Sequence, residues 1–265
     1  MVNRGGLHVN PARVGAWMLA MLLGSANATT LQYEGRAMDP ESGSLLYTER
    51  HLLREAAGNP VERLVTYHCP NGNAFARKSV DYRDSRWAPD FELNDARDGY
   101  REGLRRQEGA PWVFVRDSAG TRQRTAAIGT TSRLVADAGF DEFVRRNWQL
   151  LVAGETVSFS FALPANQRAY TFKLRRVGEL RVGEVPAHLM RLKLGGLLGL
   201  IAPQIDVAYA KSSRRLLRFE GVTNLRDADG EQWSARIEFA DRAPQASDDA
   251  EWARTLALSL RGRCG

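Results

Sequence analysis

The chain has 265 residues and a formal net charge of +6, with 43% hydrophobic and 26% charged side chains. This is an ordinary globular composition, and the ten Phe, seven Tyr and six Trp exclude a largely disordered chain. Basic and acidic residues alternate rather than cluster, so the sequence does not predict the basic face that a nucleic-acid partner requires.

The first 28 residues have the pattern of a secretory signal peptide. Arg4 and Arg13 give a basic start, a short apolar run follows from Val14 to Leu23, and Ala26-Asn27-Ala28 matches an A-x-A cleavage site. The run is about half of the ~20 residues that span a bilayer, and no later segment is long and apolar enough to do so. We therefore expect cleavage after residue 28 and a periplasmic mature chain without a transmembrane span.

Apolar residues recur at every second position along most of the remaining chain, and this period predicts half-buried β-strands. Turn chemistry at Asn71-Gly72 and Asp229-Gly230 predicts type I′ hairpins, which require antiparallel neighbours. No strand–helix–strand rhythm appears, so a parallel sheet is not expected. The predicted strands cover 30–37, 45–53, 61–69, 74–82, 157–163, 170–175, 188–194, 205–210, 214–223 and 233–239.

One amphipathic helix is predicted from Phe140 to Leu151, with Asp137 as its N-cap and Gly154 as its end. Its apolar stripe has to be buried, and the concave face of a curved sheet is the expected partner. Residues 248–260 favour a helix because Asp248 and Glu251 resemble a capping box, although the leucines that follow alternate as in a strand. Residues 83–110 are predicted to form a charged excursion with one helical turn.

These elements predict a mainly β protein: a strongly curved antiparallel sheet or open barrel with one or two plugging helices. Residues 29–265 are expected to form a single antiparallel β domain. Two β domains that meet at a seam near 110–138 are the alternative.

Two cysteines, Cys69 and Cys264, are expected to form a disulfide that ties the C-terminal tail to an early strand. The alternative is two unrelated thiols. Neither cysteine belongs to a C-x-x-C pair, and no Cys/His spacing suits zinc, so no metal or other cofactor is predicted.

Common catalytic motifs are missing from the sequence, and the chain is predicted not to be an enzyme. The best polar group is Tyr47, Glu49 and His51, which share one strand face. Alternate residues lie about 6.8 Å apart, too far for direct Glu–His contact without bending. A polar strand face without chemistry is the favoured interpretation of these residues, and an acid–base pair is the alternative.

Three further polar features favour structural interpretations. His68 lies on the opposite strand face from Cys69, and His188 heads an apolar face as a core histidine would. The run of Tyr100, Arg101, Glu102, Arg105 and Arg106 is typical of a solvated charged turn, with anion binding as the alternative.

An apolar segment broken by glycines, residues 192–203, suits either a buried connection or a lid over an apolar cavity. In the lid interpretation, this segment and the predicted helix would contact a ligand. The candidate ligand-binding residues are Phe140, Phe143, Trp148, Leu197, Leu198, Leu200 and Ile201.

The signal peptide, the many strands and the plugging helices resemble the open-barrel carriers of lipoproteins and lipids of the LolA/LolB type. The stretches 31–37, 69–72, 74–78 and 215–221 look similar to an uncharacterised family of proteobacterial exported proteins. The residue after the cleavage site is Thr29 rather than a lipidation cysteine, so the resemblance implies a soluble carrier. It implies an apolar ligand, such as an acyl chain, held in a concave sheet; the alternative is an interaction module of an envelope complex with a filled core.

Overall fold

The computed structural model describes residues 1–2 and 28–264 except 130, 132, 197–202, 228 and 241. Most of the predicted signal peptide lies outside these residues. In the described part, no helix is long and apolar enough to cross a membrane.

The described residues form one large curved sheet of 16 strands, which is not closed into a barrel. Its order is β8-β7-β6-β5-β4-β3-β2-β1-β15-β14-β13-β12-β11-β10-β9, and β16 pairs with β1. The predicted mainly β, curved antiparallel architecture is therefore confirmed. The strands are β1 Thr29–Met38, β2 Leu45–Ala56, β3 Asn59–His68, β4 Ala74–Asp81, β5 Asp90–Asp95, β6 Arg101–Gln107, β7 Ala110–Arg116, β8 Arg124–Ala127, β9 Leu134–Val135, β10 Val157–Leu163, β11 Arg168–Val182, β12 Val185–Leu194, β13 Ile205–Ala210, β14 Leu216–Arg226, β15 Gln232–Phe239 and β16 Gln245–Ser247.

The predicted charged excursion at 83–110 is wrong, because it contains β5 and β6 and reaches the start of β7. Strand β5 buries Phe91 and Leu93 while its other residues are charged or polar. Two of these residues, Asp90 and Glu92, form ion pairs with arginines of β6. The segment therefore forms strands despite its lack of β-branched residues, because a neighbouring strand supplies the countercharges.

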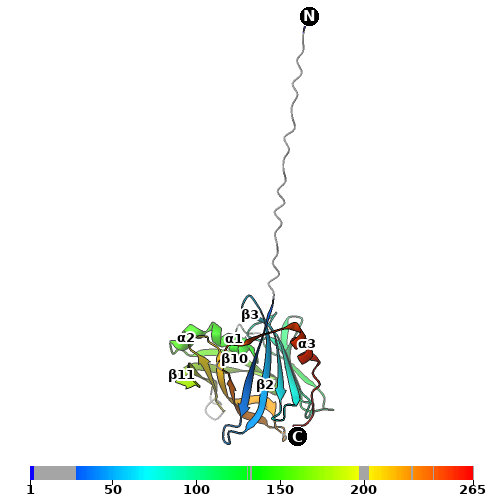
Figure 1. Cartoon of the computed structure of the whole chain (residues 1–265), viewed down its shortest axis with the longest axis vertical. Coiled ribbons are helices and arrows are strands. Elements are labelled where there is room, and N and C mark those ends of the chain that lie inside the picture. The colour runs from blue at the N-terminus through cyan, green and yellow to red at the C-terminus, as the bar shows by residue number, and fades with distance from the viewer. Residues whose placement is uncertain are drawn as a thin grey trace.

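One pair of strands departs from the expected antiparallel arrangement. Strands β9 and β10 are parallel, with Leu134 opposite Ser160 and Val135 opposite Phe161. The chain between them forms α1 (Gly139–Arg146) and α2 (Trp148–Val152), which together make the crossover that a parallel pair requires. Figure 1 shows these two helices on the opposite side of the molecule from α3 (Asp249–Ala257).

The predicted single helix from Phe140 to Leu151 is interrupted at Asn147, which has φ −97° and ψ 13°. The Asn147 side-chain amide donates a hydrogen bond of 2.8 Å to the Phe143 carbonyl oxygen. Side-chain bonds of this kind compete with the helical backbone pattern, and here one accompanies the break between α1 and α2.

The predicted N-cap of this helix is also wrong. Ala138 occupies the cap position without a side-chain hydrogen bond. Asp137 instead has a left-handed backbone (φ 43°) and pairs with a lysine of the sheet. The predicted end is confirmed, because Gly154 has φ 92° and its N–H donates to the Leu151 carbonyl oxygen.

Both predicted hairpins join antiparallel strands, but neither turn has the predicted type I′ form. In each, glycine alone of the predicted pair has positive φ: 88° at Gly72 and 83° at Gly230. The N–H of each glycine donates to the carbonyl oxygen three residues earlier, at Cys69 and Asp227. This is the geometry of a four-residue turn that ends in a left-handed glycine.

Helix α3 confirms the helix predicted within 248–260, with Asp248 as its N-cap. The Asp248 side chain accepts a hydrogen bond of 2.7 Å from the Glu251 backbone N–H. The helix has no buried residue, and Arg54 of β2 holds it by stacking on Trp252 and by an ion pair of 2.6 Å with Asp249. Helix α3 thus lies on the outer face of the sheet, whereas α1 and α2 lie on the inner face.

Candidate functional site

Glu49 and His51 meet on the inner face of β2. The Glu49 Oε2 atom lies 2.9 Å from His51 Nε2, and each residue is only 7% exposed. The expectation that they are too far apart is wrong, because the two side chains lean toward each other across the distance between alternate residues. Tyr47, the third member of the predicted group, stacks on Trp233 in an aromatic cluster.

Charged residues of α1 and its N-terminal approach face this pair. Lys78 of β4 binds Asp137 at 2.8 Å, and both side chains are largely buried. Arg63 of β3 is 8% exposed, and its nearest carboxylate oxygen is Asp141 Oδ2 at 3.9 Å. Arg145 binds the same Asp141 oxygen at 2.7 Å. We call these residues, with Glu49 and His51, the polar interior.

The polar interior and the tyrosines next to it contain buried polar atoms that have no hydrogen-bond partner in the structure, and such atoms are rare in folded proteins. They belong to strands β2, β3 and β13, to helix α1, to the residue after β4 and to the segment before α1. They are His51 Nδ1, Arg63 Nε, Tyr82 OH, Asp137 Oδ2, Asp141 Oδ1 and Tyr209 OH.

Burial governs how the interior ionises. It lowers the pKa of His51 below its ordinary value, and the hydrogen bond that His51 donates to the Glu49 carboxylate opposes this only in part. Burial also acts to lower the pKa of Lys78, but the charge and hydrogen bond of Asp137 together with the charge of Glu49 outweigh it and raise that pKa overall. His51 is therefore neutral near pH 7, while Lys78 stays charged.

The other face of α1 is apolar and completes a cluster of five phenylalanine rings with β10 and β11. Phe143 and Phe159 are buried with ring centroids 4.7 Å apart. Phe140, Phe161 and Phe172 are only partly buried, and the centroid of each ring lies within 6.4 Å of the ring centroid of another member. We call these five residues the phenylalanine cluster. Helix α1 thus separates an apolar region from the polar interior.

The structure places three of the predicted ligand-binding residues in one hydrophobic core cluster. Phe143 and Trp148 are 1% and 5% exposed, and Phe140 packs against the same cluster. Leu197, Leu198, Leu200 and Ile201 lie outside the described residues.

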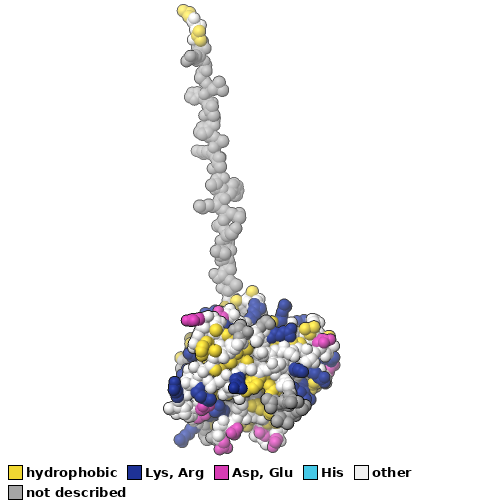
Figure 2. Space-filling view, turned by 180° about the vertical axis from the view of Figure 1, so that it is seen from behind, with side chains coloured by type: hydrophobic (Ala, Val, Ile, Leu, Met, Phe, Trp, Pro, Cys, Tyr) yellow, Lys and Arg dark blue, Asp and Glu magenta, His cyan; other side chains and the backbone are white. Residues whose placement is uncertain are grey.

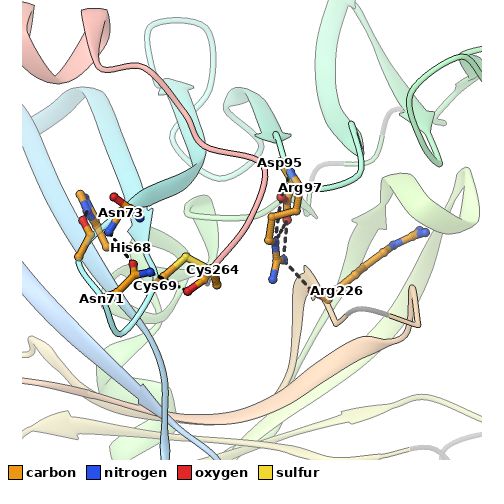
Figure 3. Close-up of a disulfide and its surroundings, with 9 residues drawn as sticks. His68, Cys69, Asn71, Asn73, Asp95, Arg97, Arg226 and Cys264 are labelled. Atoms are coloured by element: carbon orange, nitrogen blue, oxygen red, sulfur yellow. Dashed lines mark hydrogen bonds and ion pairs between the residues drawn. A yellow bond between two sulfur atoms is a disulfide. The ribbon is translucent and has the colours of Figure 1, made fainter.

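The predicted disulfide between Cys69 and Cys264 is present, with the two Cα atoms 5.3 Å apart. Figure 3 shows it where the C-terminal tail meets the end of β3. Asn71 donates from its side-chain amide to the Cys264 carbonyl oxygen at 2.7 Å. His68 points to the other strand face, where it lies 2.9 Å from the Thr66 hydroxyl. The bridge and its surroundings therefore form a structural clamp.

The remaining polar features that the sequence singled out have partners within the fold. Tyr100 donates to the Glu102 carboxylate at 2.8 Å inside the protein. Arg101 and Arg105 both bind Glu92, and Arg106 binds Asp90. His188 is 7% exposed and lies beside Trp148, with ring centroids 5.6 Å apart. His188 is therefore buried, as expected of a core histidine. The predicted solvated turn is wrong, because Arg101–Gln107 forms β6 and both Tyr100 and Glu102 are buried.

A half-open groove of about 640 Å³ lies on the outer face of β11 and β12. Four of its lining residues are basic: Lys173, Arg175, Arg191 and Lys193. The other lining residues are Thr156, Val177, Leu194, Gly195 and Gly196. We call it the cationic groove.

Sequence reasoning did not select the cationic groove. The signal was present, because the alternation predicted for 170–175 and 188–194 puts Lys173 with Arg175, and Arg191 with Lys193, on one face of successive strands. Among the described residues, no group of three or more His, Cys, Asp and Glu side chains has an arrangement that holds a metal ion.

No protein-family model matches the chain, and no curated protein matches it. Among solved structures, the chain is similar to a β-barrel-like protein of domain of unknown function DUF1849 from Brucella abortus, with a TM-score of 0.46 and 8% identity over 82% of this chain and 99% of that one. It is also similar to a putative outer membrane lipoprotein-sorting protein domain from Vibrio parahaemolyticus, with a TM-score of 0.24 and 10% identity over 89% of this chain and 93% of that one. At these TM-scores and identities, neither likeness assigns an activity to the chain.

Proposed function

We propose that the chain is a non-enzymatic periplasmic binding protein that holds an apolar or amphiphilic ligand, such as an acyl chain, on the concave side of its sheet. The observation that carries the proposal is the phenylalanine cluster. Isolated exposed apolar residues are ordinary on protein surfaces, but contiguous apolar groups that remain partly exposed are typical of binding sites.

In this proposal the ligand enters between α1 and the concave face of the sheet. One side of this helix rests on Phe159 and Phe161 through aromatic contacts, and its other side is fixed by the ion pairs of Asp137 and Asp141. An apolar chain that replaces the ring of Phe140 would lie between α1 and β10. In this proposal α1 and α2 cover the binding site, and they move outward to make room for the apolar chain.

The disulfide supports the proposed compartment, because structural disulfides persist in oxidising environments such as the periplasm. The export-type N-terminal sequence points to the same compartment.

Native mass spectrometry of the protein, purified without detergent and then incubated with oleate, tests the proposal. We expect a bound lipid-sized mass that denaturing extraction releases. Phe161→Gln should weaken oleate binding about tenfold, because one partly buried ring contributes roughly 1.5 kcal/mol to apolar contact. The matched control is Leu150→Gln on α2, a residue that is 52% exposed and lies outside the phenylalanine cluster.

An apo mass both before and after incubation with oleate would contradict the proposal. Equal losses of binding in Phe161→Gln and Leu150→Gln would also contradict it. An apo mass would favour the alternative function, an interaction module of an envelope complex whose core is filled by its own side chains, whereas equal losses would place the ligand outside the phenylalanine cluster.

A further inference from the structure

Four cations face each other in the cationic groove. Lys173 is directly opposite Lys193 in the pairing of β11 with β12, and Arg175 is directly opposite Arg191. All four side chains point away from the core, because the residues between them, Leu174 and Leu192 among others, are buried. Like charges at directly opposite positions destabilise an antiparallel pair.

At several other places on the sheet, basic side chains pair with acids on neighbouring strands. On β5 and β6, Glu92 and Asp90 bind the arginines described above. On β14 and β15, Glu220 lies opposite Arg236 and binds it at 3.0 Å. Figure 2 shows the result on one face of the molecule, where Lys and Arg side chains are interspersed with Asp and Glu.

The cationic groove departs from this pattern. Only Arg191 has a carboxylate partner, Asp206, which it binds through Nε and one Nη atom at 2.7 Å each. Among the hydrogen bonds and ion pairs of the described residues, none involves the side chain of Lys173, Arg175 or Lys193. The groove therefore concentrates positive charge that the fold itself leaves unbalanced.

The shape of the groove limits what can balance this charge. It is concave and half-open, so it can surround a compact group on several sides. Opposite positions on the two strands lie about 5 Å apart and alternate positions about 7 Å apart. Long Lys and Arg side chains can converge on one ion from such spacings.

We propose that the cationic groove binds a phosphate group, carried by a lipid headgroup or by a free phosphate. A phosphate offers several acceptor oxygens to donors that approach from different directions, and guanidinium groups bind it with paired hydrogen bonds. Lys173 and Lys193 hold the group from one end of the groove, and Arg175 holds it from the other. Asp206 fixes the position of Arg191, and Arg191 closes the groove at the same end as Arg175.

This inference does not depend on the proposed function. The phenylalanine cluster lies on the inner face of the sheet and the cationic groove on its outer face, so either site can exist without the other. The oleate measurement probes the first, and phosphate-bearing probes report on the second.

The experiment uses two probes with the purified protein. Calorimetric titration with inorganic phosphate tests for a free ligand. Co-sedimentation with vesicles of phosphatidylglycerol and phosphatidylcholine at equal amounts, against vesicles of phosphatidylcholine alone, tests for a lipid headgroup. The variant Lys173→Gln/Lys193→Gln removes two groove charges, and Lys211→Gln/Arg254→Gln removes two charges that lie elsewhere and are paired with Glu179 and Glu251.

We expect wild-type protein to bind at least one of the two probes. The groove variant should bind it at least tenfold more weakly, and the control should stay within twofold of wild type. Binding of inorganic phosphate would identify a free phosphate as the source, and binding of phosphatidylglycerol vesicles alone would identify a headgroup. Failure to bind either probe, or equal losses in the two variants, would overturn the proposal.

Discussion

The buried imidazole of His51 couples the polar interior to pH. Its ring stacks on Tyr33 at 4.5 Å and contacts Glu49, while the positive charges of Arg63 and Lys78 oppose its protonation. Burial lowers its pKa, so the folded protein takes up this proton at a lower pH than the unfolded chain does. Between these two pKa values the unfolded chain binds more protons, and the free energy of unfolding therefore falls as the pH falls below about 6.5.

We predict that His51→Gln makes stability less dependent on pH. Urea unfolding at pH 7.5, 6.5 and 5.5 should show a smaller loss in the variant than in wild type, by at most about 1.4 kcal/mol per pH unit. His68 and His188, whose pKa values are also lowered by burial, and Glu102 and Glu142, whose pKa values are raised by burial, remain in both proteins and cancel in the comparison. If the free energy of unfolding fell equally with pH in both proteins, the pKa of His51 would be the same in the folded and unfolded states, which would contradict the prediction.

At the residue scale, the sequence predicted which side chains share a strand face but not which of them touch. The period of two placed Glu49 and His51 together, and their direct contact depends on side-chain orientations that periodicity does not encode. The partners Lys78 and Asp137 are 59 residues apart. Their pairing follows from the position of α1 against β4, which no local pattern specifies.

At the element scale, the start of α1 is fixed by a close approach between two backbones. A Cβ atom on Gly139 would lie 2.0 Å from the Trp87 carbonyl oxygen and 2.7 Å from Pro89 Cδ. The Ala136 N–H donates to the same Trp87 oxygen at 2.8 Å. Only glycine leaves room for this contact, which seats α1 over the concave face.

Gly139→Ala should therefore lower the free energy of unfolding by about 1–3 kcal/mol, since the added methyl group must displace backbone that cannot move freely. Urea unfolding followed by tryptophan fluorescence measures the change. The control is Gly129→Ala, where a Cβ would meet no heavy atom within 4 Å and the effect should stay within about 0.5 kcal/mol. A similar loss in both variants would contradict this account of α1.

Elements with strong local signals were predicted, and those stabilised by distant partners were not. Helix α3 has its capping residues within its own first turn, so the sequence contains the whole signal. The charged residues of strand β5 pair with arginines of β6. The break at Asn147 comes with a hydrogen bond from its side chain to the Phe143 carbonyl oxygen. Neither feature changes the apolar period on which the prediction was based.

At the scale of the whole molecule, the first strand and the C-terminal strands of the described chain are neighbours in the sheet. Strand β1 lies between β2 and β15, so the N-terminal and C-terminal halves form one continuous ladder. The sequence predicted curvature but not this order, because hairpin signals specify only neighbours that follow each other in the chain. The disulfide was the one long-range contact that the sequence did predict, since the chain has only two cysteines.

The disulfide closes a loop of 195 residues and anchors a tail that has few other contacts. Arg77 donates to the Leu256 carbonyl oxygen at 2.7 Å, and the Arg261 N–H donates to the Ala74 carbonyl oxygen at 2.7 Å. Loss of the bridge gives the unfolded chain more conformations and so lowers its free energy. The chain-entropy model sets this stabilisation of the unfolded state at about 5 kcal/mol for so long a loop. Strain and residual structure reduce this figure, so we expect a loss of about 2–4 kcal/mol.

Cys264→Ser should accordingly lower the melting temperature by roughly 5–15 °C for a chain of this size. Reductant should lower the melting temperature of wild type by the same amount and leave the variant unchanged, because the bridge is its only target among the described residues. Hydrogen exchange should show faster exchange at Arg261 in both the reduced protein and the variant, since the tail is then held by hydrogen bonds alone. Identical melting curves with and without reductant would show that the bridge does not contribute to stability.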